Sequence, residues 1–64
     1  MKVKVIINPV AGRGRASQAK SQILRALLEY DVELHLEETK GPHHAAEIAR
    51  QAVQGGFDLI IVAG

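Results

Sequence analysis

The chain has 64 residues, a formal net charge of +1, no cysteine and 47% hydrophobic residues. A chain this short forms one small domain at most, burying about 60% of the surface that its unfolded form exposes. The ordinary apolar content argues against intrinsic disorder, and the lack of cysteine excludes disulfides and thiolate metal sites. The near-neutral charge, with one Tyr, one Phe and no Trp, argues against a nucleic-acid-binding protein.

Membrane insertion and secretion are also excluded by the apolar pattern. The longest apolar run, Leu59–Ala63, is far too short to cross a bilayer. Lys2 and Lys4 precede a short apolar stretch, but Asn8 and Pro9 interrupt it before it reaches the length of a signal peptide. We therefore expect a cytoplasmic protein.

The first half of the chain predicts a strand and then a helix. Lys2–Ile7 (KVKVII) is rich in β-branched residues, and Asn8-Pro9 ends it. After a glycine-containing loop, apolar residues at helical spacing predict an amphipathic helix that ends near Tyr30-Asp31. The residues expected on its buried face are Ala16, Ala19, Ile23, Ala26, Leu27 and Tyr30.

The second half predicts a strand, a helix and a further strand. Val32, Leu34 and Leu36 alternate with polar residues, as in a half-exposed strand. Gly41-Pro42 marks a turn before a helix that begins at about His43 and ends at Gly55-Gly56. Its expected buried residues are Ala45, Ile48, Ala49, Ala52 and Val53. Leu59–Val62 is continuously apolar, as in a strand covered on both faces.

The resulting βαβαβ order predicts an α/β fold, with a three-stranded parallel sheet and helices on both faces. A spatial order of 2-1-3 places the charged, alternating second strand at an edge, whereas the order 3-2-1 would place it in the centre and is less favoured. The outer edge of the third strand is then unpaired, which predicts either further chain beyond Gly64 or self-association through that edge.

The loop between the first strand and the first helix, Asn8–Arg15, is the candidate functional segment. Ligands of open α/β sheets lie beyond the carboxyl ends of the strands. Gly12 and Gly14 let the backbone approach a ligand, and Arg13 and Arg15 supply donors for phosphate. The loop is not a Walker A motif, and it matches the dinucleotide fingerprint only in part. The alternative is a flexible connection with solvent-facing arginines.

The motifs together resemble the catalytic domain of the diacylglycerol kinase family, which includes bacterial lipid kinases, sphingosine kinases and ceramide kinases. The resemblance rests on Asn8–Gly14 (NPVAGRG), Thr39, His44-Ala45 with Glu47, Ile48 and Ala49, and the final segment Asp58–Gly64 (DLIIVAG). In that family the last strand leads into a Gly-Gly-Asp-Gly-Thr loop, of which Gly64 would be the first glycine. The chain would then be a partial nucleotide-binding domain, a fragment of a larger Rossmann-like kinase domain.

The resemblance implies an ATP-dependent kinase that phosphorylates a lipid hydroxyl with Mg²⁺ and contacts the membrane surface transiently. The implied nucleotide-binding residues are Asn8, Pro9, Val10, Ala11, Gly12, Thr39 and Gly64, with Arg13, Gly14 and Arg15 as candidate phosphate contacts. The family's later acidic residues for metal binding and proton transfer are absent, so residues 1–64 alone are expected to be inactive. No metal ligand is assigned, since no carboxylate or cysteine lies at zinc-like spacing from the histidines. No catalytic residue is assigned either, since Asp31 and Asp58 are expected at strand entrances, away from the ligand end.

Two alternatives remain open at this point. The visible motifs do not choose the phosphate acceptor, so the chain is also compatible with a segment of an NAD kinase-like enzyme. An inert βαβαβ module without activity is the second alternative. The histidines allow two interpretations as well: His44 either positions the start of the second helix or is merely solvated.

Overall fold

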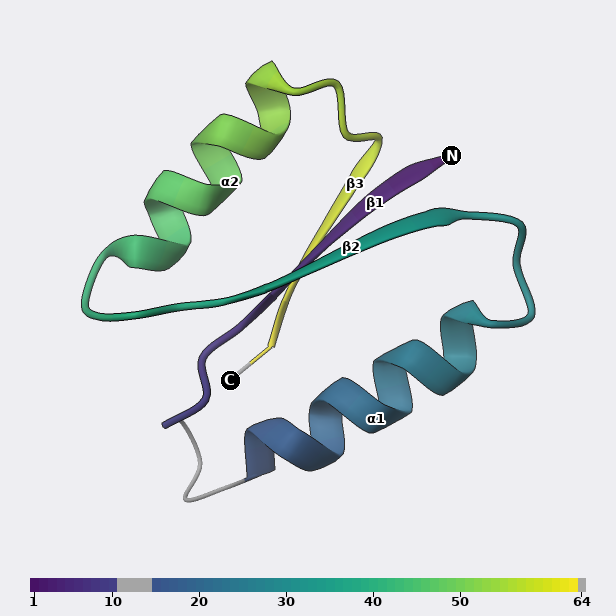
Figure 1. Ribbon diagram of the computed structural model, residues 1–64, viewed down its shortest axis with the longest axis horizontal. Helices are drawn as coiled ribbons and strands as arrows, with labels where there is room; N and C mark the ends of the chain where they lie inside the picture. The colour runs from purple at the N-terminus through teal and green to yellow at the C-terminus, as the bar shows by residue number, and fades with distance from the viewer. Residues whose placement is uncertain (11–14, 64) are drawn as a thin grey trace.

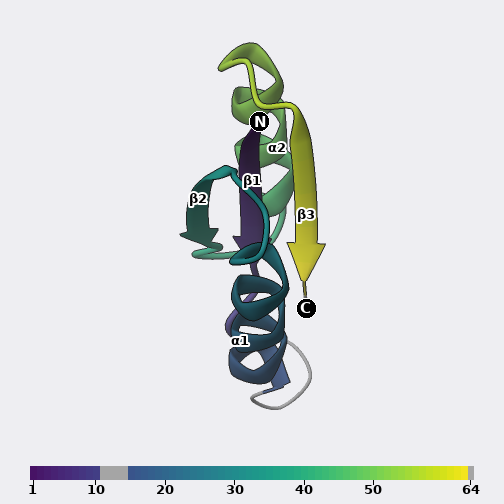
Figure 2. The same cartoon turned by 90° about the vertical axis from the view of Figure 1, so that its right-hand side faces the viewer.

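The computed structural model, which describes residues 1–10 and 15–63, has the predicted order of elements. These elements are β1 (Lys2–Ile7), α1 (Arg15–Leu27), β2 (Glu33–Glu38), α2 (His44–Gln54) and β3 (Leu59–Ala63). The strands form one parallel sheet in the order β2-β1-β3, which confirms the predicted 2-1-3 order (Figure 2). The helices α1 and α2 lie on opposite faces of this sheet (Figure 1).

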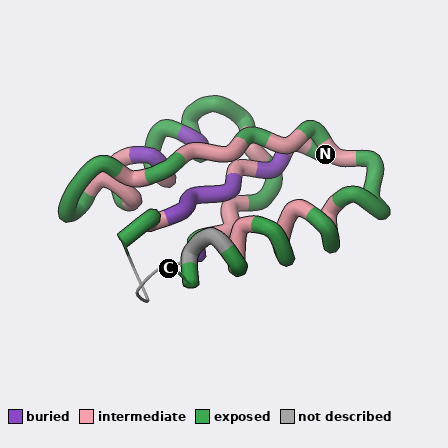
Figure 3. The backbone as a smooth tube through the Cα atoms, turned by 60° about the horizontal axis from the view of Figure 1, so that its bottom comes forward, coloured by how far each residue is buried: buried purple, intermediate pink, exposed green. Residues whose placement is uncertain are grey.

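The central strand β1 carries most of the core. Its odd-numbered residues Val3, Val5 and Ile7 are at most 1% exposed and form a cluster with Ala63, against which α1 packs. Ile6 points to the opposite face, since side chains alternate along a strand, and it is fully buried there. The run of buried residues along β1 is visible in Figure 3. Both faces of the sheet are therefore covered at β1.

The first helix is shorter than its apolar pattern predicts. α1 ends at Leu27 rather than near Tyr30-Asp31. The chain turns there, with the Tyr30 N–H donating to the Leu27 carbonyl at 3.0 Å, so that β2 can begin beside Met1. Ala19, Ile23 and Leu27 pack on the core as predicted. Ala26 and Tyr30 are exposed instead of buried, and Tyr30 lies in the turn that follows the helix.

The second helix has a narrow buried face and a well-defined end. Ile48 and Ala52, four residues apart, are its buried side chains. Val53 was expected on this face but is 67% exposed. It follows Ala52 by one residue and therefore lies about 100° further around the helix. At the carboxyl end, the N–H of Phe57 donates to the Ala52 carbonyl at 3.2 Å and the N–H of Gly56 donates to the Val53 carbonyl at 3.3 Å.

These two bonds form a Schellman motif, which requires a residue in the left-handed region. Gly56 supplies it, with a φ of +81°. Glycine adopts this conformation without the clash that a Cβ would introduce. The predicted termination of the helix at Gly55-Gly56 is confirmed.

The expectation that β3 is covered on both faces is wrong for the described residues. Leu59 is 39% exposed and Val62 is 61% exposed, while Ala63 is buried. The cause is position: β3 is an edge strand, and α2 packs more closely on β1 than on β3.

Candidate functional site at the carboxyl ends of the strands

Short backbone hydrogen bonds join the carboxyl ends of the three strands around Ile7 and Asn8. The N–H of Asn8 donates to the Ala63 carbonyl at 3.0 Å, at the end of β3. The N–H of Thr39, which follows β2, donates to the Ile7 carbonyl at 2.7 Å. The residues that follow β1 and β2 and the last residue of β3 are therefore brought to one rim of the sheet, as a parallel arrangement requires.

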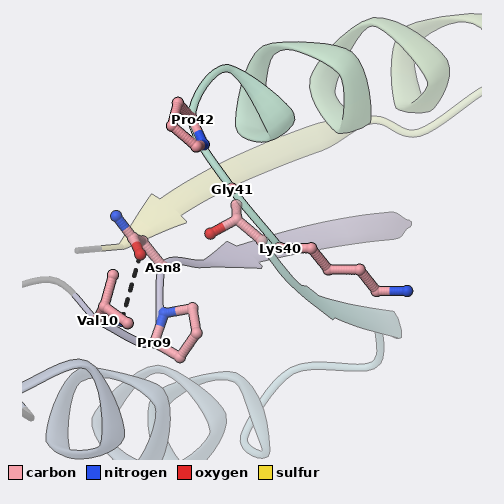
Figure 4. Close-up of a pocket in the computed structure, with 7 residues that line it drawn as sticks. Asn8, Pro9, Val10, Lys40, Gly41 and Pro42 are labelled. Carbon is pink, nitrogen blue, oxygen red and sulfur yellow. Dashed lines mark hydrogen bonds between the residues drawn. The ribbon is translucent and has the colours of Figure 1, made fainter.

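A cleft of about 270 Å³ opens at this rim (Figure 4). Its described lining comes from two segments, one after β1 and one after β2. The lining residues are Asn8, Pro9, Val10, Thr39, Lys40, Gly41 and Pro42. Asn8 and Thr39 are half-buried, whereas the other five are exposed. The least exposed residues of the described lining are thus two polar, uncharged ones.

Asn8 has a defined orientation. Its Oδ1 accepts a hydrogen bond from the backbone N–H of Val10 at 3.3 Å, which closes a local turn after β1 (Figure 4). Asn and Asp stabilise such turns because their short side chains reach the backbone two residues ahead. Within residues 1–10 and 15–63, the side-chain nitrogen of Asn8 has no hydrogen-bond partner.

The second lining segment, residues 39–42, forms one wall of the cleft and is hydrogen-bonded to the start of α2. The N–H of Lys40 donates to Nδ1 of His44 at 2.8 Å, and the N–H of His44 donates to the Gly41 carbonyl at 3.3 Å. The side chain of Lys40 extends away from Asn8 (Figure 4). The interpretation of His44 as a residue that positions the start of the second helix is therefore supported over simple solvation.

Glu37 and Glu38, which end β2 just before the cleft, are not among its described lining residues. Glu37 of β2 pairs with Lys4 of β1 at 2.9 Å. The hydrogen bond from Lys4 holds the pKa of Glu37 below its ordinary value. Mg²⁺ in proteins prefers carboxylate and phosphate oxygens. The described lining offers no carboxylate, so these residues do not fit a resident Mg²⁺ site, and no cluster of three or more acidic or histidine ligands occurs in the described ranges.

The structure brings together four of the residues that the sequence singled out, namely Asn8, Pro9, Val10 and Thr39. Arg15 is the exposed first residue of α1 and is not part of the described lining. The remaining predicted residues, Ala11, Gly12, Arg13, Gly14 and Gly64, lie outside the described residues.

Sequence reasoning missed Lys40, Gly41 and Pro42 as lining residues. A signal for them was present. They follow the carboxyl end of the second strand directly, and the rule that ligands gather beyond strand ends applies to that strand as much as to the first. In this segment the family resemblance singles out Thr39, and Gly41-Pro42 is interpreted as a turn.

The geometry defines an α/β domain with a cleft at the carboxyl ends of its parallel strands, where ligands of open α/β sheets lie. Residues 2–64 match the family model described as diacylglycerol kinase catalytic domain, and the chain belongs to this family. No curated protein and no solved structure gives a significant match. None of the helices in the described ranges has the length and apolar character needed to cross a membrane.

Proposed function

We propose that this chain is the N-terminal nucleotide-binding segment of an ATP-dependent lipid kinase, and that the cleft at the strand ends holds phosphates or ribose of ATP. The observation that carries this proposal is the convergence of Asn8 and Thr39 in one cleft, at strand ends joined by hydrogen bonds of 3.0 and 2.7 Å. Membership of the diacylglycerol kinase catalytic domain family supports the nucleotide and lipid as substrates.

The chemistry of the cleft suits a polar, anionic ligand. The Asn8 amide and the Thr39 hydroxyl are neutral donors, and Gly41 lets a ligand approach the backbone, since nothing lies within 4 Å of the position of a Cβ there. None of the described lining residues is anionic. We propose Ala11, Gly12, Arg13, Gly14 and Arg15 as further contacts from the loop, together with Gly64.

The described lining residues would bind rather than catalyse. Phosphoryl transfer to a hydroxyl depends on positioning the nucleotide, stabilising charge and accepting the hydroxyl proton. Because the described lining contains no carboxylate or other general base, we propose that residues outside this chain supply proton transfer and metal binding. Mg²⁺ would enter as a complex with the ATP phosphates. Residues 1–64 alone would then bind ATP without phosphorylating a lipid.

The same proposal places the complete kinase in the cytoplasm, with transient contact to the membrane surface where its lipid substrate lies. Self-association through the free edge of β3 would be a separate property of the chain. The uncharged side chains of Leu59–Ala63 favour it, because an unpaired apolar edge is a template for another strand.

The test is a titration of ¹⁵N-labelled protein with Mg·ATP, followed by amide NMR. We expect the largest shifts at Asn8, Thr39, Lys40 and Gly41, with saturation on a single binding curve. The amino end of the sheet provides an internal control, since Lys2 and Asp58 lie away from the cleft. Shifts concentrated at Lys2 and Asp58, or no saturable shifts with millimolar Mg·ATP, would overturn the proposed function.

A further inference from the structure

We propose that His44 is a positioning residue of the cleft: its neutral imidazole holds the segment Lys40–Pro42 in place, and its protonation releases that segment. This inference rests on the proposed function, because its functional consequence is a pH-dependent affinity for Mg·ATP. The coupling between His44 and the cleft wall can nevertheless be measured without any nucleotide.

His44 makes two hydrogen bonds to the wall segment, one through its side chain and one through its backbone. Lys40 donates its backbone N–H to Nδ1 of His44 at 2.8 Å, and His44 donates its own backbone N–H to the Gly41 carbonyl at 3.3 Å. At the other end, Thr39 is fixed to β1 through the Ile7 carbonyl. The wall of the cleft is therefore anchored once to the sheet and once to His44.

The side-chain bond requires one protonation state of the imidazole. A backbone N–H can only donate, so Nδ1 must carry a lone pair and the ring proton must lie on Nε2. Protonation of the imidazole places a second proton on Nδ1. The Lys40 N–H then loses its acceptor and faces a donor. Histidine is the side chain whose charge ordinarily changes between about pH 5 and 8.

His43, which lies between the wall segment and α2, makes the loss of the Lys40–His44 hydrogen bond consequential. His43 has a φ of 66°, in the left-handed region that residues other than glycine rarely adopt. Its side chain makes no capping hydrogen bond to α2. The bond from Lys40 to the His44 side chain spans His43 and therefore favours this conformation, together with the backbone bond from His44 to Gly41. Without it, His43 can relax toward negative φ and move Gly41 and Pro42 with it.

Charged residues on each neighbouring element lie near His44. Glu37 lies on β2, Glu47 lies on α2, and Lys40 lies on the wall itself. The pKa of Glu37 is lowered chiefly by the hydrogen bond from Lys4 and in smaller part by the charge of His44, and the pKa of Glu47 is lowered chiefly by Arg50 with a smaller contribution from His44.

The test compares His44→Asn and His44→Ala with the unmodified chain. In asparagine, Oδ1 takes the place of Nδ1 as acceptor but does not titrate. The affinity for Mg·ATP is measured at pH 7.5 and pH 5.5. We expect the unmodified chain to lose about threefold or more in affinity relative to His44→Asn on acidification, which corresponds to one weakened hydrogen bond. His44→Ala should be weaker than His44→Asn at both pH values.

The titration of the nucleotide's own phosphates is common to all variants and cancels in this comparison. His35→Asn is the matched control, because it removes an exposed histidine outside the described lining of the cleft and should retain the pH profile of the unmodified chain. Equal pH profiles for the unmodified chain and His44→Asn would overturn the inference. So would a loss of the pH effect in His35→Asn.

A second measurement separates this inference from the proposed function. Without nucleotide, the Lys40 amide of the unmodified chain should show a pH transition in its ¹⁵N shift and faster hydrogen exchange at low pH, which His44→Asn should abolish. If the Lys40 amide shows this transition but the chain does not bind Mg·ATP, the proposed function is overturned and the His44 coupling remains as a property of the loop. Absence of the transition would overturn the coupling itself.

Discussion

Lys2 and Asp58 exchange two hydrogen bonds at the amino end of the sheet. The N–H of Lys2 donates to Oδ2 of Asp58 at 2.7 Å, and the N–H of Asp58 donates to the Lys2 carbonyl at 2.8 Å. The ammonium of Lys2 also donates to the Gly55 carbonyl at 3.2 Å. These bonds align the entrances of β1 and β3, at the end of the sheet opposite the cleft. Asp58 is therefore structural, as its place before the third strand indicates.

Asp58→Ala removes the side-chain acceptor and leaves the N–H of Lys2 without it. We expect the free energy of unfolding to fall by about 1–2 kcal/mol, the usual effect of losing a hydrogen bond to a charged group. Urea denaturation followed by circular dichroism measures this loss. Asp58→Asn keeps an acceptor oxygen and should lose less than half as much. Equal losses for the two variants would show that the carboxylate charge, rather than the hydrogen bond, stabilises this end.

The fold was largely predictable because its signals are local. The alternation of Leu34 and Leu36 with charged residues identified β2 as an edge strand, and glycines marked the end of α2. The errors have tertiary causes. Val53 and Val62 are apolar but exposed, since burial depends on where each helix crosses the sheet, and the periodicity of a sequence does not contain that information.

The candidate site was predictable only in outline. The strand-end rule singled out Asn8 after the first strand, and the family resemblance singled out Thr39. The structure brings both into one cleft. The contact between Lys40 and His44 could not be predicted from the sequence, because it accompanies a left-handed conformation of His43. A sequence pattern indicates that conformation mainly where the residue is glycine. A histidine next to another histidine has no local signal for such a role.

The Lys4–Glu37 pair predicts a pH-dependent contribution to stability. The hydrogen bond from Lys4 lowers the pKa of Glu37, so between the folded and unfolded pKa values the unfolded state binds more protons than the folded state. The contribution is therefore full well above the ordinary glutamate value of 4.5 and is lost as the pH falls through the lowered pKa of the folded state. Lys4→Met should flatten the decline in stability on acidification while costing less than about 1 kcal/mol at pH 7.

The measurement is the free energy of unfolding from urea titrations between pH 7 and pH 3. Glu37→Gln should flatten the decline to the same extent, and the double variant should add nothing to either single variant. A decline in Lys4→Met as steep as that of the unmodified chain would exclude the pair as its source.

The left-handed conformation of His43 predicts a stabilising substitution. An L-residue in this region is disfavoured by about 1–2 kcal/mol, and glycine escapes that cost but gains entropy in the unfolded chain. We expect His43→Gly to raise stability by about 0.5 kcal/mol, or the melting temperature by about 2–4 °C. His43→Ala keeps the Cβ and should give no increase. A glycine variant that melts at or below the alanine variant would show that the conformation is not strained.

Asn8 offers a way to separate turn formation from ligand binding in the proposed nucleotide site. Asn8→Asp keeps an oxygen that can accept the Val10 N–H, so it should preserve the turn and the melting temperature, whereas Asn8→Ala loses that bond and about 0.5–1 kcal/mol of stability.

The affinity of these two variants for Mg·ATP should follow a different order. Alanine removes one donor and should weaken binding about three- to tenfold, while aspartate adds a negative charge beside the phosphates and should weaken it more. Calorimetric titration and thermal melting of both variants provide the two readouts. If the more stable aspartate variant also bound Mg·ATP as well as the unmodified chain, Asn8 would be a turn former only, and the proposed phosphate contact at the end of β1 would have to be assigned elsewhere.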